Sequence, residues 1–235
     1  MAEPLLTIKN LSAWYDPKKK VLSEVSLELS DHEAVGLIGM NGAGKTTVLK
    51  VVSGLLPGFS AEQILALGKP CSLRGREFKR WRYTVFAEDR SFSYFTFREY
   101  LSYVFSAYGK ALPDVTELIR GFHFEAYADV LMKELSTGSR KKAYLITGFA
   151  LKPKLLLLDE PVNGLDYQST EYLYQLIRGY REHGTVLFAS HILESLTQTS
   201  DRVLVLEHGT IRRTFEGGRI DAAGIREALN NDMDV

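Results

Sequence analysis

A glycine-rich segment at residues 39–47 has the residue types and spacing of a phosphate-binding loop. It fits the pattern G-x-x-x-x-G-K-S/T, in which glycines let successive backbone N–H groups converge on phosphate oxygens. Lys45 is then expected to reach the β- and γ-phosphates of a nucleotide, and the Thr46 hydroxyl to ligate Mg²⁺. The residues expected to contact the nucleotide here are Gly39, Asn41, Gly42, Ala43, Gly44, Lys45, Thr46 and Thr47.

Two adjacent carboxylates follow a run of four leucines at residues 155–158. Such a run predicts a buried strand, and ligands of open α/β sheets bind at the carboxyl ends of strands. Asp159 is expected to hold Mg²⁺, directly or through water. Glu160 is expected beside the γ-phosphate as general base, or as the group that orients the attacking water. With the phosphate loop, this pair predicts hydrolysis of a nucleoside triphosphate.

Apolar patterning along the chain predicts the elements that position these groups. Residues 34–38 form the continuous apolar run of a buried central strand, and residues 45–52 have the pattern of a helix. A second helix-forming segment follows Ser136, a predicted helix N-cap, and runs to residue 151. Further strands are predicted at 5–11, 25–29, 83–86, 155–159, 185–189, 202–207 and 210–215. Further helices are predicted at 96–108, 114–121, 124–131, 167–183 and 191–199, and the alternation predicts a mainly parallel sheet with a small helical insertion.

Length and composition restrict the class of protein. The chain has 235 residues, 45% hydrophobic and 25% charged, which fits one α/β domain. Its 29 basic and 29 acidic residues balance, and this disfavours a nucleic-acid partner. The single cysteine, Cys71, cannot form an intramolecular disulfide and favours a reducing compartment. No signal peptide and no apolar run of about 18 residues is visible, so any membrane role is expected to act through a partner. The polar tail, residues 230–235, is expected to fray.

Together with further segments, these motifs resemble the ATP-binding subunit of ABC transporters over residues 5–215. The phosphate loop resembles its Walker A motif, and residues 155–160 resemble its Walker B motif. Residues 135–139, Leu-Ser-Thr-Gly-Ser, resemble the signature motif, usually Leu-Ser-Gly-Gly-Gln, and residues 163–166 are similar to the D-loop. His191 is similar to the switch histidine, and Tyr15 matches the aromatic residue that stacks on adenine.

The resemblance implies a Mg²⁺-dependent ATPase that works as a pair. Two subunits face head to tail in this family, so Ser136 and Gly138 of one subunit would complete the Walker site of the other, with Asp166 in the D-loop. His191 would hydrogen-bond the γ-phosphate and orient Glu160. The implied fold is an α/β P-loop NTPase with a mainly parallel sheet core, an N-terminal antiparallel β part and a small helical subdomain. It would form one domain over residues 1–235, with the core at 1–88 and 152–235 and the helical subdomain at 89–151.

The chain departs from the family pattern at two places. Thr137 and Ser139 replace the usual glycine and glutamine of the signature, which predicts activity that is reduced rather than abolished. The lid segment, residues 86–90, has no glutamine; Glu88 is the best match and a third expected Mg²⁺ ligand, while a shift of one residue would place Asp89 there.

The expected function is ATP-driven transport, with similarity to bacterial export systems. The chain would lie in the cytoplasm on the inner face of the cell membrane, bound to a separate membrane-spanning subunit and to a second ATP-binding subunit of the same or another sequence. Eight aromatic residues between Phe92 and Tyr108 would fill the helical subdomain or line a groove for a cytoplasmic helix of the membrane subunit. The alternatives are a non-transport ATPase of this superfamily that acts on soluble partners, and a nucleotide-binding regulatory module with little turnover.

Overall fold

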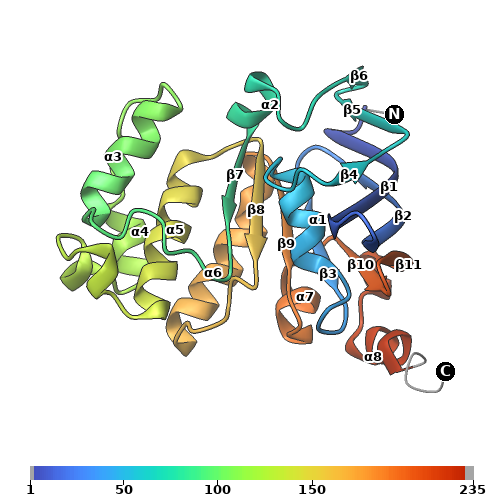
Figure 1. Ribbon diagram of the computed structural model, residues 1–235. Helices are drawn as coiled ribbons and strands as arrows, with labels where there is room; N and C mark the ends of the chain where they lie inside the picture. The colour runs from blue at the N-terminus through green and yellow to red at the C-terminus, as the bar shows by residue number, and fades with distance from the viewer. Residues whose placement is uncertain (1–2, 231–235) are drawn as a thin grey trace.

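The strands of the computed structural model form two sheets (Figure 1). The structure describes residues 3–230, so residues 231–235 of the tail predicted to fray lie outside the described residues. The smaller sheet has the order β2-β1-β5-β6, with β4 also paired to β1, and all of its pairs are antiparallel. Its strands are β1 (Leu6–Asp16), β2 (Lys19–Leu29), β4 (Phe59–Ser60), β5 (Gln63–Ala66) and β6 (Lys69–Pro70). The antiparallel N-terminal part expected from the sequence is confirmed.

The larger sheet has the order β11-β10-β3-β9-β8-β7 and is parallel except for the pair between β10 and β11. Its strands are β3 (Ala34–Ile38), β7 (Arg82–Val85), β8 (Leu155–Asp159), β9 (Thr185–Ala189), β10 (Arg202–Glu207) and β11 (Thr210–Glu216). Every residue of β3, β8 and β9 is buried, as expected of parallel strands covered on both faces. The segments that follow these three strands therefore meet at one edge of the sheet.

Helices cover both faces of the parallel sheet. In the core they are α1 (Lys45–Val52), α2 (Arg76–Trp81), α6 (Tyr167–Gly179), α7 (Leu193–Thr199) and α8 (Ala222–Asn230). Leu155 and Leu157 of β8 pack in the cluster that contains α1 and the antiparallel sheet, whereas Leu156 and Leu158 pack in the cluster that contains α6 and a further helix, α5 (Thr137–Leu151). Successive side chains of β8 point to opposite faces of the sheet, so this strand packs against the helices and strands on both faces. No helix within residues 3–230 is long and apolar enough to cross a bilayer.

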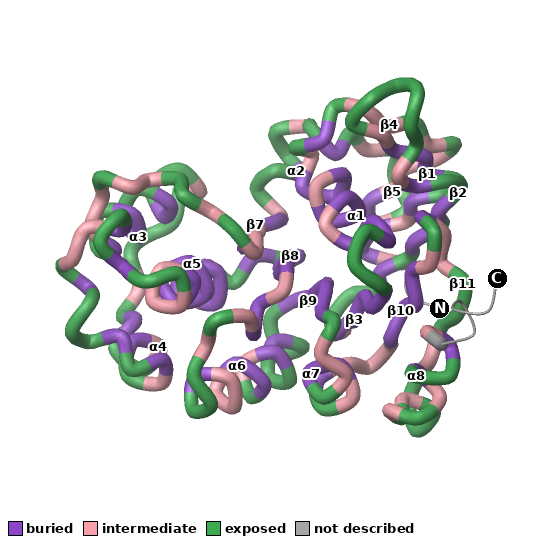
Figure 2. Tube along the Cα trace, turned by 60° about the horizontal axis from the view of Figure 1, so that its bottom comes forward, coloured by how far each residue is buried: buried purple, intermediate pink, exposed green. Residues whose placement is uncertain are grey.

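A helical lobe lies beside β7, on the opposite side of the molecule from the antiparallel sheet (Figure 1). It consists of α3 (Phe97–Ala107), α4 (Thr116–Gly121) and α5 (Thr137–Leu151), and α5 is mostly buried within it (Figure 2). Of the eight aromatic residues predicted to fill this lobe or line a groove, Phe97, Tyr100 and Phe105 are buried in the core. Tyr94 and Tyr103 are exposed, so the aromatic segment supplies both core and surface.

One predicted helix is wrong. Residues 124–131 contain only a short 3₁₀ turn, Glu125–Tyr127, because the backbone is non-helical at Phe124 before it and extended at Leu131 after it. His123 has a φ of 51°, in the left-handed region, and Leu131 is extended and bridges to Thr96. The apolar residues Phe124 and Ala128 are buried at helical spacing, but packing against the lobe rather than a helix accounts for that spacing.

Candidate functional site

The phosphate loop joins β3 to α1, and its glycines are required by its backbone. Gly42 and Gly44 have φ values of 84° and 108°, which side chains other than glycine rarely adopt. A Cβ atom on Gly39 would lie 2.2 Å from the backbone oxygen of Leu206 in β10. The other predicted contact residues lie in the same segment: Asn41 is exposed, and Ala43 and Thr47 are buried.

The Lys45 ammonium is enclosed by this loop. Its side chain is buried, and Nζ donates hydrogen bonds to the carbonyl oxygens of Gly39 at 2.8 Å and Met40 at 3.4 Å. Nζ also lies 3.9 Å from Oε1 of Glu160. A buried cation at the N-terminus of α1 adds to the positive end of the helix, so this position favours an anion.

Thr46 and Asp159 meet across the same site. The Thr46 hydroxyl lies 3.1 Å and 3.0 Å from the two carboxylate oxygens of Asp159. Burial raises the pKa of the Asp159 carboxyl above its usual value, while the Thr46 hydrogen bond acts in the opposite direction. A hydroxyl and a buried carboxylate in contact fit Mg²⁺, which takes one or two protein oxygens and otherwise waters and phosphate oxygens.

Glu160 is held from three sides. Its φ of 46° is left-handed, and its backbone N–H donates to the carbonyl of Ala189 at the end of β9 at 2.9 Å. Oε2 lies 2.7 Å from Nδ1 of His191 and accepts the His191 backbone N–H at 3.4 Å. Lys141 of α5 donates from Nζ to the Glu160 carbonyl oxygen at 2.7 Å. These contacts fix a strained backbone and aim the Glu160 side chain toward Lys45.

The signature segment caps α5, as the sequence predicts. The Ser136 hydroxyl accepts the backbone N–H of Ser139 at 3.1 Å, and Ser136 and Thr137 are exposed. Gly138 packs on the D-loop so closely that a Cβ there would lie 2.1 Å from the carbonyl oxygen of Gly164. Within residues 3–230, no hydrogen bond or ion pair connects residues 136–139 to the phosphate loop of the same chain.

Asp166 has partners inside the chain for both carboxylate oxygens. Oδ1 accepts the backbone N–H of Ser169 at 2.9 Å and so caps α6, and Oδ2 lies 2.6 Å from Nζ of Lys142. The hydrogen bond from Lys142 holds the pKa of Asp166 well below its usual range. Asp166 therefore joins α6 to the signature helix α5.

Two lysines of this site, Lys141 and Lys142, were not predicted from the sequence as site residues. Both are buried although they stand in a basic tripeptide that reads as a solvated helix start. Their helical spacing to Leu145, Ile146 and Phe149, which are also buried, is the signal that places them on the inward face of α5.

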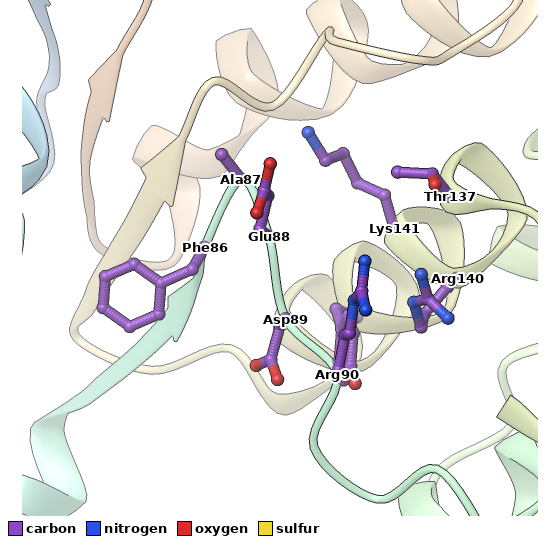
Figure 3. A pocket seen from close by; sticks show the side chains of 9 residues that line it. Phe86, Ala87, Glu88, Asp89, Arg90, Thr137, Arg140 and Lys141 are labelled. Atoms are coloured by element: carbon purple, nitrogen blue, oxygen red, sulfur yellow. The ribbon is translucent and has the colours of Figure 1, made fainter. Parts of the chain in front are cut away.

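The lid segment lies between the sheet and α5. Glu88 and Asp89 both line a cavity of about 700 Å³ that Thr46 and Asp159 also line. Figure 3 shows the two side chains pointing in different directions, with Thr137 and Lys141 of α5 on the opposite wall of the adjoining pocket. Either carboxylate is thus placed near the Thr46 and Asp159 pair, and Glu88 is the more exposed of the two.

Tyr15 lies at the end of β1, and 57% of its surface is exposed. The Nζ atom of Lys50, on α1, is 5.3 Å from the centre of its ring. An open aromatic face therefore lies beside the helix that begins at the phosphate loop, which suits stacking of a planar base.

A phosphate loop, a Walker-type acidic pair and a histidine on a parallel sheet define a P-loop nucleotide-binding domain of the α/β class. A family model described as ABC transporter matches residues 22–163, more than half of the chain. The chain belongs to the ABC transporter ATP-binding family.

Relatives and solved structures agree with this assignment. AlbC of Bacillus subtilis, an ABC transporter ATP-binding protein by name, is 35% identical over 222 residues, covering 91% of this chain and 92% of the relative. Nod factor export ATP-binding protein I of Sinorhizobium fredii is 34% identical, over 90% of this chain and 62% of its own length. The structure of an ATP binding subunit of an ABC transporter aligns with a TM-score of 0.81 and 26% identity, over 95% of this chain and 92% of that chain. A bacterial Atm1-family ABC exporter with ATP bound shares the fold, with a TM-score of 0.82 and 21% identity, over 98% of this chain and 41% of that chain.

Proposed function

We propose that this chain is the ATP-hydrolysing subunit of an export-type ABC transporter and acts on a separate membrane-spanning subunit. One observation carries the proposal: Lys45, Glu160 and His191, which follow three neighbouring parallel strands, form one connected cluster. The contact of Thr46 with Asp159 lies beside it. Similarity to Nod factor export proteins supports the export direction.

In this proposal the phosphate loop and Lys45 bind the triphosphate. Lys45 exchanges its bonds to the Gly39 and Met40 carbonyls for the β- and γ-phosphate oxygens. Thr46 and Asp159, with Glu88 or Asp89 nearby, would hold Mg²⁺, which when bound neutralises phosphate charge. Tyr15 stacks on the adenine ring.

Hydrolysis then depends on Glu160. Its carboxylate accepts a proton from water as the water oxygen bonds to the γ-phosphorus and the bond to the ADP oxygen breaks. His191 orients Oε2 from 2.7 Å, and Lys141 fixes the backbone of the same residue. The base is therefore positioned by both β9 and the signature helix.

We further propose that two such chains, of the same or a related sequence, close on ATP head to tail. Ser136 and the N-terminus of α5 are exposed and have no bond to their own phosphate loop. The free N–H groups and the positive helix end suit a γ-phosphate bound by the other chain. Gly138 sets the position of this helix end through its contact with the D-loop.

The exposed aromatic residues of the lobe suit docking on the membrane subunit, at the inner face of the cell membrane. Tyr94 is 76% exposed, and its ring is 4.6 Å from Nζ of Lys133. Phe92 and Phe95, which are partly buried, contact the ring of Tyr103, which is itself exposed. We expect Tyr94→Ala with Phe95→Ala to release the chain from membranes while it still folds, at an unfolding temperature lowered by the loss of Phe95 packing; unchanged association would contradict this docking site.

Steady-state ATPase measurements on the purified chain and its membrane complex test the proposal. We expect Glu160→Gln to bind ATP and lose turnover, and His191→Ala to reduce turnover, because the base is lost or poorly oriented. Turnover of Glu160→Gln at the parental rate would show that the base is another residue. Absence of turnover in both preparations would support the regulatory module, and purification with soluble partners alone would support the non-transport ATPase.

A further inference from the structure

The lid segment, residues 86–90, is attached to the rest of the chain near its two ends. Near the first end, the backbone N–H of Ala87 donates a hydrogen bond to the Asp159 carboxylate. Just beyond the other end, the Ser91 carbonyl oxygen accepts a hydrogen bond from the Tyr144 hydroxyl of α5 at 2.8 Å. The lid therefore spans the distance from the parallel sheet to the signature helix.

Between these two attachments the lid carboxylates have no partner on another element. Among residues 3–230, the side chains of Glu88 and Arg90 form no hydrogen bond or ion pair. Oδ1 of Asp89 accepts the backbone N–H of Ser91 at 2.7 Å, which closes a turn within the segment itself. The position of the two carboxylates thus depends on the attachments at the ends.

Tyr144 is held firmly enough to serve as one of these attachments. Its side chain is 3% exposed, and its ring packs edge-to-face on the ring of Tyr100, with centres 5.3 Å apart. The Tyr100 hydroxyl lies 2.5 Å from the buried hydroxyl of Tyr83 on β7. One turn before Tyr144 on α5 is Lys141, which donates to the Glu160 carbonyl. The helix α5 therefore contacts the segment that carries the base and the segment that carries the lid carboxylates from adjacent turns.

We propose that Tyr144 is a positioning residue for the metal site: by holding Ser91, its hydroxyl keeps the lid carboxylates beside the contact of Thr46 with Asp159. These carboxylates line the same cavity as that contact. A carboxylate on a loop that is already ordered loses less conformational entropy when it binds a cation, so the attachment raises the affinity for the metal. The inference rests on the proposed function, because it concerns the Mg²⁺ that accompanies ATP.

Two tyrosine-to-phenylalanine variants separate this role from a general effect on stability. Tyr144→Phe removes the hydroxyl and keeps the packed ring. Tyr180→Phe is the matched control, because the Tyr180 hydroxyl donates to the Pro153 carbonyl at the same distance of 2.8 Å and its side chain is also buried. Pro153 precedes β8, so this bond lies at the edge of the sheet opposite to the site. Both variants lose one phenol–carbonyl hydrogen bond, and only Tyr144→Phe should affect the lid.

Hydrogen exchange of the nucleotide-free chain, followed by mass spectrometry, measures the attachment itself. The amides of residues 87–91 should exchange about fivefold faster in Tyr144→Phe, which is the factor that a typical hydrogen bond contributes. Tyr180→Phe should leave the exchange of these amides unchanged. Parental exchange in Tyr144→Phe, or equal acceleration in both variants, would overturn the proposal.

Binding of Mn²⁺, observed by electron paramagnetic resonance with a non-hydrolysable ATP analogue present, measures the consequence for the metal. Tyr144→Phe should weaken Mn²⁺ binding about threefold or more, while the affinity for the analogue without metal stays within about twofold because the phosphate loop is unchanged. Tyr180→Phe should keep both affinities. Parental Mn²⁺ affinity in Tyr144→Phe would overturn this inference and leave the proposed function standing. A parental chain that binds neither the analogue nor Mn²⁺ would overturn the proposed function, on which the inference rests.

Discussion

Replacing Gly138 with alanine should destabilise the chain if the start of α5 packs on the D-loop, residues 163–166. It should stabilise the chain if the start of α5 does not pack there. In the first turn of an isolated helix, alanine would stabilise the chain by about 0.5–1 kcal/mol relative to glycine. In this structure the new Cβ would lie 2.1 Å from the carbonyl oxygen of Gly164 and 3.2 Å from its carbonyl carbon. Both are backbone atoms, so the D-loop and the start of α5 must separate by about 1 Å. Overpacking of this kind typically lowers the free energy of unfolding by roughly 1–3 kcal/mol.

The displacement also reaches the proposed site. Asp166 and Lys142, which connect α6 to α5, lie close to the point of contact, and the exposed Ser136 starts the same helix. A shift of about 1 Å in catalytic positioning can lower a rate about 100-fold. We therefore expect Gly138→Ala to lose most ATPase activity while ATP binding to the phosphate loop of the single chain changes little.

Two assays measure this prediction. The unfolding midpoint should fall by about 2–4 °C for each kcal/mol, and steady-state ATPase activity should fall with it. Gly179→Ala is the matched control, because its φ is −74° and no heavy atom lies within 4 Å of an added Cβ. Its midpoint should stay or rise. A Gly138→Ala chain with a raised midpoint and parental activity would refute the packing of the signature on the D-loop.

Three further substitutions test single contacts of the site. Lys45→Ala should weaken ATP binding about tenfold or more by calorimetry, since a charged hydrogen-bond donor to the phosphates is lost; parental affinity would exclude Lys45 from the phosphate site. Thr46→Val should raise the Mg²⁺ concentration needed for half-maximal ATPase activity, whereas Thr46→Ser should not, because only the hydroxyl that contacts Asp159 differs. Asp166→Asn should lower the free energy of unfolding in urea near neutral pH by roughly 1 kcal/mol. Lys142 lowers the pKa of Asp166, so this contribution is present above the unfolded value of about 3.9 and is lost as the pH falls below it; a difference independent of pH would contradict the ion pair.

The elements at the centre of the site could be predicted because a fully buried strand has a recognisable pattern in the local sequence. The strands β3, β8 and β9 are buried on both faces and are therefore uninterrupted apolar runs, and their observed bounds match the predicted ones. The helix α1 begins at Lys45 as predicted, since the glycine-rich loop must end there for its N–H groups to converge.

Elements that depend on distant partners could not be predicted. The two-residue strands β4 and β6 exist through pairing with β1 and β5, and α2 is a short basic helix without a clear apolar period. The contact of Lys141 with the Glu160 carbonyl joins residues 19 positions apart on two elements, so it follows from tertiary packing and not from a local motif. The roles proposed for Tyr15, Ser136 and Glu88 likewise remain predictions, because they concern groups that approach the chain from outside.

Closure of two chains on ATP through the signature helix predicts that Glu160→Gln changes its mass in solution when Mg-ATP is added. Size-exclusion chromatography with light scattering would be run with and without Mg-ATP, because a chain that binds ATP without hydrolysing it should hold the pair together. We predict a shift from 26.5 kDa to twice that mass with Mg-ATP, and loss of the shift when Ser136→Glu is added. A chain that binds ATP and stays at 26.5 kDa would contradict closure of two copies of this chain.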